Sequence, residues 1–372
     1  MVPPMQTRKL ALLTSGGDAP GMNAALRSAT LLAHAHGMQV VGVRNGYVGL
    51  IAGEFIPLSP ADVWGIVREG GTILGSARCL EMLTREGRDT ARRQLAAGGI
   101  TDLVVIGGNG SLTGALALTE PAELGEQTLR VVGIPASIDN DLGLTGLSIG
   151  VDTAMNTIVE ACDKIADTAS AHGRTFIVEV MGRDCGYLAM TAGVAAGADL
   201  VLFPEAGQDE SHAVEAVVRT IISARSRVVP TKRVLVIKAE GVKVSPERLK
   251  TAVEARLAEL GHRGALVETR ITVLGHIVRG GRPTGQDRVM AGRLGFVAVH
   301  ALLAGDTRVM AAWGLSMAPP PGARVSESDP HCWVVTLEAV LAETRRLLDG
   351  TAPLVKWRTR IFNEIDAVLN QP

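Results

Sequence analysis

The sequence has few cysteines, few aromatic side chains and almost no net charge, and these shortages exclude several classes of protein. None of its four cysteines forms a Cys-x-x-Cys spacing, so neither a zinc site nor a disulfide framework is expected. Its 37 Lys and Arg balance 38 Asp and Glu to a net charge of −1, which argues against binding to nucleic acid or a membrane surface. No apolar run reaches the roughly 18 residues of a membrane helix. With reduced thiols and no signal-like N-terminus, we expect a cytoplasmic protein.

What the sequence does contain is an alternation of short β-branched runs with longer amphipathic stretches. This pattern is typical of an α/β fold with mainly parallel strands. The length of 372 residues suggests two to three domains, and we place a boundary near 145–150, with the chain recrossing near 276. Helices are expected at 21–36 and from 151 to about 171. Strands are expected at 10–13, 39–43, 103–106, 131–134, 176–180, 200–203, 234–237 and 265–274.

Two of the expected strands run into glycine-rich turns that precede helices, TSGGDAPG at 14–21 and GGNGS at 107–111. Glycine at such a turn lets backbone N–H groups face a phosphate, and the N-terminus of the following helix adds partial positive charge. Neither turn is a Walker A loop or a G-x-G-x-x-G motif, so the dinucleotide-binding interpretation is weak. One such turn alone is equally well explained by packing. Two of them at the carboxyl ends of strands in one sheet favour ligand binding.

An acidic turn, Asp139-Asn140-Asp141, follows the expected strand at 131–134. Taken alone, such a turn is most often a solvated loop. Phosphoryl transfer, however, needs a base for the acceptor hydroxyl and a divalent metal for the phosphate charge, and two carboxylates at i and i+2 can divide these tasks.

Arginines beside the ends of strands are the third candidate feature. Their planar guanidinium groups bind phosphate in a bidentate manner. Each alone is more typical of a surface ion pair, and His276 is equally well explained as a core histidine. As a set, next to the strand-end glycines, they favour a site that handles phosphate. The set comprises Arg78, Arg174, Arg183, Arg270 and Arg279.

Six motifs in order resemble the phosphofructokinase A family, over roughly residues 8–310. They are TSGGDAPGMNAALR, GGTILGSAR, VVIGGNGS, SIDND, HGRTFIVEVMGRDCGY and ETRITVLGHIVRGG. The resemblance implies two Rossmann-like three-layer α/β/α domains with mainly parallel sheets and the active site in the cleft between them. Residues 1–150 with about 277–312 would bind the phosphate donor. Residues 151–276 with about 313–372 would bind the sugar phosphate and carry the C-terminal tail.

The resemblance also implies a role for each matching residue. Asp139 would be the general base, Arg78 and Arg183 would stabilise the transferring phosphoryl group, and Asn109 with Asp141 would hold Mg²⁺. The residues implied for the nucleotide site are Gly16, Tyr47, Arg78, Cys79, Gly108, Asn109, Gly110 and Ser111. Those implied for the sugar phosphate are Ser137, Asp139, Arg174, Met181, Gly182, Arg183, Glu240, Arg270, His276 and Arg279.

The expected activity is that of a 6-phosphofructokinase, which transfers a phosphoryl group from ATP to fructose 6-phosphate. The family donates residues matching Arg174 and Arg270 from a neighbouring subunit, so a homo-oligomer, a tetramer or a dimer, is implied. Gly110 and Ala136 match positions that are small in ATP-dependent members, while pyrophosphate as the donor is the alternative.

One residue departs from the family pattern. The family usually has aspartate where this chain has Asn109, which brings no charge to a metal. Three interpretations follow: an active enzyme with a shifted metal requirement, a slow enzyme, or a non-catalytic sugar-phosphate-binding paralogue. We favour the first, because the general base and all five arginines are present.

Overall fold

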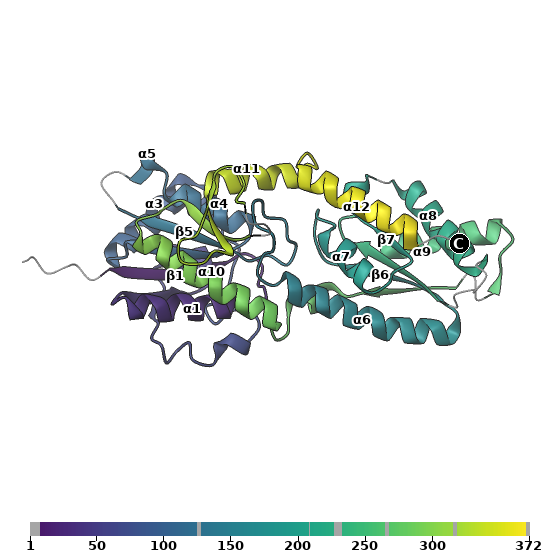
Figure 1. The fold of residues 1–372 in the computed structure, drawn as a ribbon, viewed down its shortest axis with the longest axis horizontal. Coiled ribbons are helices and arrows are strands. Elements are labelled where there is room, and N and C mark those ends of the chain that lie inside the picture. Colours follow the sequence, from purple (N-terminus) through teal and green to yellow (C-terminus); the bar gives the residue numbers. More distant parts are fainter. Residues whose placement is uncertain are drawn as a thin grey trace, which may run out of the picture. The chain divides into compact units, whose positions relative to one another are not determined.

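The computed structural model of the chain describes residues 8–124, 128–207, 209–226, 233–264, 268–314 and 318–369. The chain forms two compact units. The first unit comprises Met1–Thr153 and Arg279–Arg345, and the second unit comprises Ala154–Val278 and Arg346–Pro372. One helix, α6 (Val151–His172), begins in the first unit and continues into the second (Figure 1).

The first unit is built on one sheet of eight strands in the order β11-β12-β10-β5-β4-β1-β2-β3. The five central strands, β10, β5, β4, β1 and β2, are parallel, and β3, β12 and β11 each pair antiparallel with the neighbouring strand. All six residues of β4 are buried, because helices cover both faces of the sheet, and this is why the strand appears as a continuous apolar run. The strands are β1 (Lys9–Ser15), β2 (Gln39–Val43), β3 (Phe55–Pro57), β4 (Asp102–Gly107), β5 (Arg130–Pro135), β10 (Val309–Trp313), β11 (Ala323–Val325) and β12 (Cys332–Thr336).

Helices lie on both faces of this sheet (Figure 1). On one face α1 (Met22–Ala35) packs closely against α10 (Gly285–Leu303), where a Cβ on Gly295 would come within 2.7 Å of the carbonyl oxygen of Ala25. The other face carries a continuous apolar core contributed by four helices. These are α2 (Gly46–Ala52), α3 (Arg85–Ala97), α4 (Asn109–Leu118) and α11 (Leu337–Leu348), and the short segments of the unit are α5 (Pro121–Leu124) and the 3₁₀ helices η1 (Ile66–Arg68) and η2 (Glu81–Leu83).

The second unit contains a parallel sheet of four strands in the order β7-β8-β6-β9. Its apolar core lies between this sheet and its helices. The strands are β6 (Thr175–Val180), β7 (Leu200–Leu202), β8 (Val234–Ala239) and β9 (Thr269–Val273). The other elements, besides most of α6, are α7 (Tyr187–Ala195), α8 (Glu210–Ser226), α9 (Pro246–Glu259), α12 (Pro353–Leu369) and the 3₁₀ helices η3 (Pro204–Ala206) and η5 (Gly275–Arg279).

The predicted α/β class with mainly parallel sheets is confirmed, and every expected strand has a counterpart; residues 265–267 of the last one lie outside the described residues. The domain limits differ from those expected in one place. We expected the chain to leave the first unit near residue 312, whereas it does so after Arg345. The reason is that β12 pairs antiparallel with β10, from Trp313 opposite Cys332 to Val309 opposite Thr336, which keeps this segment in the first sheet.

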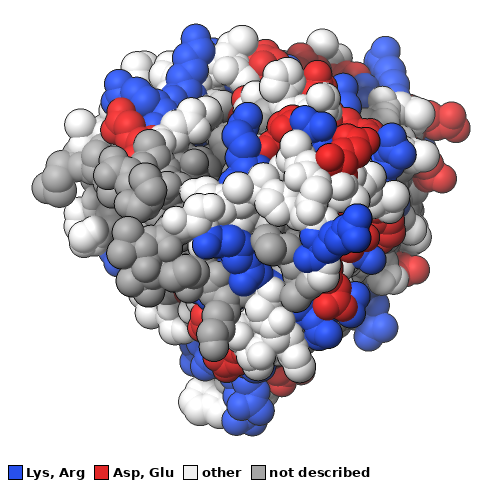
Figure 2. Space-filling model, turned by 90° about the vertical axis from the view of Figure 1, so that its right-hand side faces the viewer, with Lys and Arg blue, Asp and Glu red and all other residues white. Residues whose placement is uncertain are grey.

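The surface of the chain carries both signs of charge. On the face in Figure 2, basic and acidic side chains are interspersed, as the net charge of −1 leads one to expect. Among the described residues, no helix combines the length and the apolar character needed to cross a bilayer.

Asp287, in the first turn of α10, holds the start of α6. Its side chain is fully buried, and burial raises the pKa of its carboxyl group. One carboxylate oxygen accepts a hydrogen bond from the backbone N–H of Gly150 at 2.9 Å. The other accepts hydrogen bonds from the backbone N–H of Thr153 at 2.8 Å and from its hydroxyl group at 2.5 Å. The carboxylate thus provides acceptors at a helix N-terminus, where backbone donors lack partners within the helix.

We expect Asp287→Ala to lower the free energy of unfolding by about 1.5–3 kcal/mol, because it leaves buried donors without a charged acceptor. Chemical denaturation followed by circular dichroism measures this change. Gln286→Ala, an exposed neighbour in the same helix, is the control and should change the stability by less than about 0.5 kcal/mol. Equal stabilities of the two variants would contradict the assigned role.

Candidate active site

The two glycine-rich turns meet at the carboxyl ends of β1 and β4, which are neighbouring parallel strands. Gly16 has a φ of 89°, and a Cβ there would lie 3.1 Å from the hydroxyl oxygen of Ser111. A Cβ on Gly107 would lie 2.5 Å from the same hydroxyl and from the carbonyl oxygen of Ser15. The hydroxyl of Ser76 donates a hydrogen bond of 2.5 Å to the Gly16 carbonyl. Side chains at these glycines would therefore force the two turns apart.

The second turn continues directly into α4. The helix begins at Asn109 after the N-cap residue Gly108, and no acidic side chain lies in its first turn. As at any helix N-terminus, its first backbone N–H groups have no partner within the helix and carry partial positive charge, and no acidic side chain offsets that charge here. A Cβ on Gly110 would meet no atom within 4 Å, so the space beside this turn is open. This combination suits the binding of a phosphate group.

The acidic turn after β5 is buried and fixed in shape. Asp139, Asn140 and Asp141 have exposed fractions of 2%, 2% and 8%, so the interpretation as a solvated loop is wrong. Asn140 has a φ of 50°, a conformation that asparagine tolerates better than most residues. Its side-chain oxygen accepts a hydrogen bond from the N–H of Ser148 at 3.0 Å. The hydroxyl of Ser137 donates to a carboxylate oxygen of Asp141 at 2.9 Å.

Arg279 connects the acidic turn with the first glycine-rich turn. Its Nη2 lies 4.0 Å from Oδ1 of Asp139, and its Nη1 lies 3.5 Å from the carbonyl oxygen of Asp18. A Cβ on Gly17 would come within 2.8 Å of Nη1, so a side chain there would shift the guanidinium from this position. The arginine is therefore held beside the predicted general base, at the edge of the sheet where both glycine-rich turns lie.

The residues predicted to line the nucleotide site differ in exposure. Tyr47 is 3% exposed, and its hydroxyl donates a hydrogen bond of 2.6 Å to the carbonyl oxygen of Ser111. Burial, reinforced by the nearby Cys79, raises the pKa of this hydroxyl far above its usual range. Its ring fills the space beside Gly114. Tyr47 thus supports the first turn of α4 from beneath, whereas Arg78 is exposed and Cys79 is half-buried.

In the second unit a strained loop follows β6. Gly182 and Arg183 both have positive φ values, 145° and 49°. Glu240, after β8, accepts hydrogen bonds on one carboxylate oxygen from the backbone N–H groups of both residues, at 3.1 and 2.7 Å. Met181 is buried, while the side chain of Arg183 is exposed. Glu240 therefore fixes the backbone that presents Arg183.

Arg174 and Arg270 lie at the other end of the same strands. Arg174 precedes β6, and Arg270 lies near the start of β9. Both form ion pairs with Glu268, and the hydrogen bond from Arg174 at 3.0 Å lowers the pKa of this carboxyl group. The six residues of β6 separate Arg174 from the loop that carries Arg183, which corresponds to about 20 Å at the usual rise per residue, and Arg270 lies opposite Phe176, the second residue of β6. His276 is exposed in η5.

Two contributors to the site were not among the predicted residues, Gly17 and Asn140. A signal for Asn140 was present, since asparagine between two aspartates in a turn is a common left-handed residue. Gly17 gave no separate signal, because its close contact is with the guanidinium of Arg279, which is more than 250 positions away.

Known proteins similar to this chain belong to one family. A family model described as Phosphofructokinase matches residues 9–302. The chain is 48% identical to the ATP-dependent 6-phosphofructokinase of Thermotoga petrophila over 305 residues, which are 82% of this chain and 89% of that protein. It is 45% identical to ATP-dependent 6-phosphofructokinase 1 of Thermus thermophilus over 82% of this chain and 88% of that protein.

Solved structures give the same result for the fold. Phosphofructokinase from Saccharomyces cerevisiae matches with a TM-score of 0.80 at 32% identity, over 96% of this chain and 50% of that chain. This chain therefore spans about half the length of the yeast chain. A pyrophosphate-dependent phosphofructokinase from Marinobacter aquaeolei matches with a TM-score of 0.71 at 23% identity, over 90% of this chain and 83% of that one, and so shares the fold.

Proposed function

Because the chain belongs to the phosphofructokinase family, we propose that it transfers the γ-phosphoryl group of ATP to the 1-hydroxyl of fructose 6-phosphate. The products are fructose 1,6-bisphosphate and ADP. The observation that carries the proposal is the buried Asp139, held 4.0 Å from Arg279 beside two glycine-rich turns. A carboxylate in this place accepts the proton of the sugar hydroxyl as the phosphorus–oxygen bond forms.

The chain's own groups account for the rest of the reaction. The N-terminus of α4 and the backbone of the first turn orient the donor's phosphates. Arg78 and Arg183 offset the charge on the oxygens of the transferring group, and Arg279 with His276 binds the sugar phosphate. Glu240 acts by holding the Gly182–Arg183 backbone in its strained conformation. Positioning and charge supply most of the catalysis in reactions of this class.

A steady-state assay with purified protein tests the proposal. With fructose 6-phosphate and Mg²⁺ present, ATP should support turnover and pyrophosphate should support little. The open space at Gly110 and the small Ala136 favour ATP. Strong activity with pyrophosphate and none with ATP would overturn the choice of donor. Binding of fructose 6-phosphate without any product would instead favour a non-catalytic paralogue.

Magnesium belongs to this proposal. Asp141 and Asn109 follow β5 and β4, which are adjacent parallel strands, so both side chains start from the same edge of the sheet. One carboxylate and one amide oxygen are ligands that suit Mg²⁺ when phosphates and water complete the octahedron. When bound, the ion would neutralise part of the donor's phosphate charge. Asn109 contributes an oxygen but no charge, so the affinity for the ion should depend mainly on Asp141.

We expect Asn109→Asp to lower the Mg²⁺ concentration for half-maximal activity by at least about fivefold, since one extra charge near 4 Å contributes on the order of 1 kcal/mol even in water. A titration of Mg²⁺ at saturating substrates measures this. Asn109→Ala is the matched control and should shift the concentration in the opposite direction. If both variants kept the original value, position 109 would not contact the metal.

We further propose that Arg174 and Arg270 serve the sugar-phosphate site of a neighbouring subunit in a homo-oligomer. The support is their place near the amino end of β6, whereas Arg183 follows its carboxyl end. Mixing Arg270→Ala subunits with Asp139→Asn subunits should restore activity that neither variant has alone. Different affinity tags on the two variants establish whether one oligomer contains both kinds of subunit. If they form but remain inactive, the two arginines do not act across an interface.

We propose a cytoplasmic location, and the four cysteines support it. None of the four forms a disulfide, which fits a reducing compartment. Burial raises the pKa of Cys162 to about 11 and of Cys332 to about 12, so these two remain protonated and unreactive at neutral pH.

A further inference from the structure

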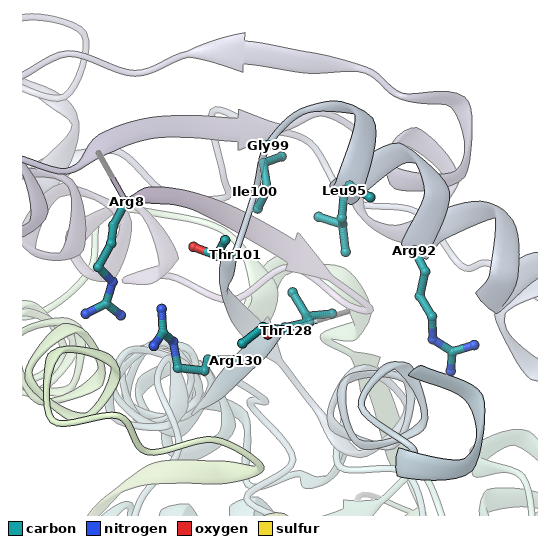
Figure 3. Close-up of a pocket in the computed structure, with 10 residues that line it drawn as sticks. Arg8, Arg92, Leu95, Gly99, Ile100, Thr101, Thr128 and Arg130 are labelled. Carbon is teal, nitrogen blue, oxygen red and sulfur yellow. The ribbon is translucent and has the colours of Figure 1, made fainter. Parts of the chain in front are cut away.

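A pocket of about 450 Å³ lies at the opposite edge of the first unit's sheet from the candidate active site. It is lined by residues at the amino ends of three parallel strands, among them Arg8 before β1, Thr101 before β4 and Arg130 at the start of β5 (Figure 3). The glycine-rich turns and the acidic turn follow the carboxyl ends of the same three strands. The pocket is thus separate from the site assigned above.

Two arginines of the pocket share a single carboxylate. Asp102 is fully buried and accepts hydrogen bonds from Nη2 of Arg8 at 2.6 Å and from Nε of Arg130 at 2.8 Å. Each arginine donates a second bond to Asp102, from Nε of Arg8 at 3.1 Å and from Nη2 of Arg130 at 3.2 Å. The Thr101 hydroxyl also donates to Asp102 at 2.8 Å, and Nη2 of Arg8 also donates to the carbonyl oxygen of Leu302 at 2.7 Å. One negative charge offsets only one of the two positive charges. Nη1 of each arginine takes no part in these bonds, and both side chains are about one quarter exposed.

The positive charge is concentrated at this end of the pocket. Figure 3 shows Arg8 and Arg130 extending toward each other, while Arg92 lies at the other end and points away. Arg92 is 3% exposed and pairs with Asp89 and Glu123 at 2.8 and 2.7 Å, so its charge is neutralised within the protein.

The wall between the two ends is apolar. Leu95, Ile100 and Leu129 line it and are almost fully buried. The pocket therefore combines one net positive charge, guanidinium N–H donors and an apolar surface, within the volume range of small-molecule sites.

We propose that this pocket binds a small organic phosphate, with the phosphate group on Arg8 and Arg130 and the remainder of the molecule against the apolar wall. Guanidinium groups bind phosphate through paired N–H donors, and Asp102 fixes the orientation of both side chains before the ligand arrives. The proposal is independent of the chemistry at the other edge of the sheet.

Isothermal titration with inorganic phosphate tests the proposal. Ala96→Glu, in the last turn of α3, places a carboxylate on the pocket wall without removing either arginine. Ala97→Glu is the matched control, because it makes the same change at the next exposed position, which does not line the pocket. Phosphate bound at the catalytic site contributes equally to both variants, so a difference between them reports on the pocket.

We expect Ala96→Glu to weaken one class of phosphate site at least tenfold, and Ala97→Glu to behave as the unmodified chain. Arg130→Gln should show the same loss as Ala96→Glu while keeping the Arg8–Asp102 pair, with folding checked by thermal melting. Turnover with ATP should be unchanged in all three variants. Identical phosphate isotherms for Ala96→Glu and Ala97→Glu would overturn the proposal and leave the arginines as a structural clamp.

Discussion

Asp139→Asn should lower kcat by a factor of about 10²–10⁴, the usual contribution of a positioned general base. Asparagine has the same shape but cannot accept the proton of the sugar hydroxyl. The buried turn around it is held by the bonds of Asn140 and by the Ser137–Asp141 bond, none of which involves the Asp139 carboxylate. The sugar phosphate should therefore bind with nearly unchanged affinity.

Steady-state kinetics and titration of fructose 6-phosphate separate these two effects. Asp62→Asn provides the control, because it makes the same chemical change in an exposed turn of the same unit, where the carboxylate accepts hydrogen bonds from Ser59. Its kcat should equal that of the unmodified enzyme. If Asp139→Asn retained near-normal turnover, another group would be the base and the assignment of this carboxylate would be withdrawn.

Gly110→Asp is expected to reduce kcat/KM for ATP by at least about 100-fold. The reason is electrostatic, because a carboxylate in the first turn of α4 would oppose the donor's phosphates where the helix terminus now attracts them. Two unit charges 4 Å apart interact by about 4 kcal/mol near a protein surface, more than this change requires.

The stability of this variant should not fall. A Cβ at Gly110 meets no atom within 4 Å, and an acidic residue is favourable at a helix N-terminus. Gly110→Ala is the control for side-chain volume and should retain most of its activity with ATP. Equal losses in both variants would show that space, rather than charge, decides the use of ATP at this position.

The sequence predicted the central strands well because they depend on local signals. β1 and β4 are covered on both faces, so they stand out as continuous apolar runs that end in glycine. The resemblance to known motifs placed Asp139 and Arg279 in one site but did not predict the contact between them. Nothing local in the chain indicates that residues 140 positions apart lie 4.0 Å apart.

The remaining features depend on tertiary contacts. β10 and β12 were not predicted. Their antiparallel pairing keeps this part of the chain in the first unit, and such a pairing depends on tertiary structure. Tyr47 was expected at the nucleotide site, but its burial beneath α4 follows from the missing side chain at Gly114. The hydrogen bonds that Glu240 accepts from two backbone N–H groups of a strained loop likewise join residues 58 and 57 positions apart, which no local pattern indicates.

The two edge strands of the first sheet, β3 and β11, affect the tendency of the chain to aggregate. A long exposed edge would present unpaired backbone groups to other chains and would promote aggregation. Here each edge strand has only three residues, and β3 ends in Pro57 while β11 carries the charged Arg324. Proline removes a donor, and a charge opposes intermolecular strand pairing. The sheet can thus be wide and still offer little template for β-aggregation.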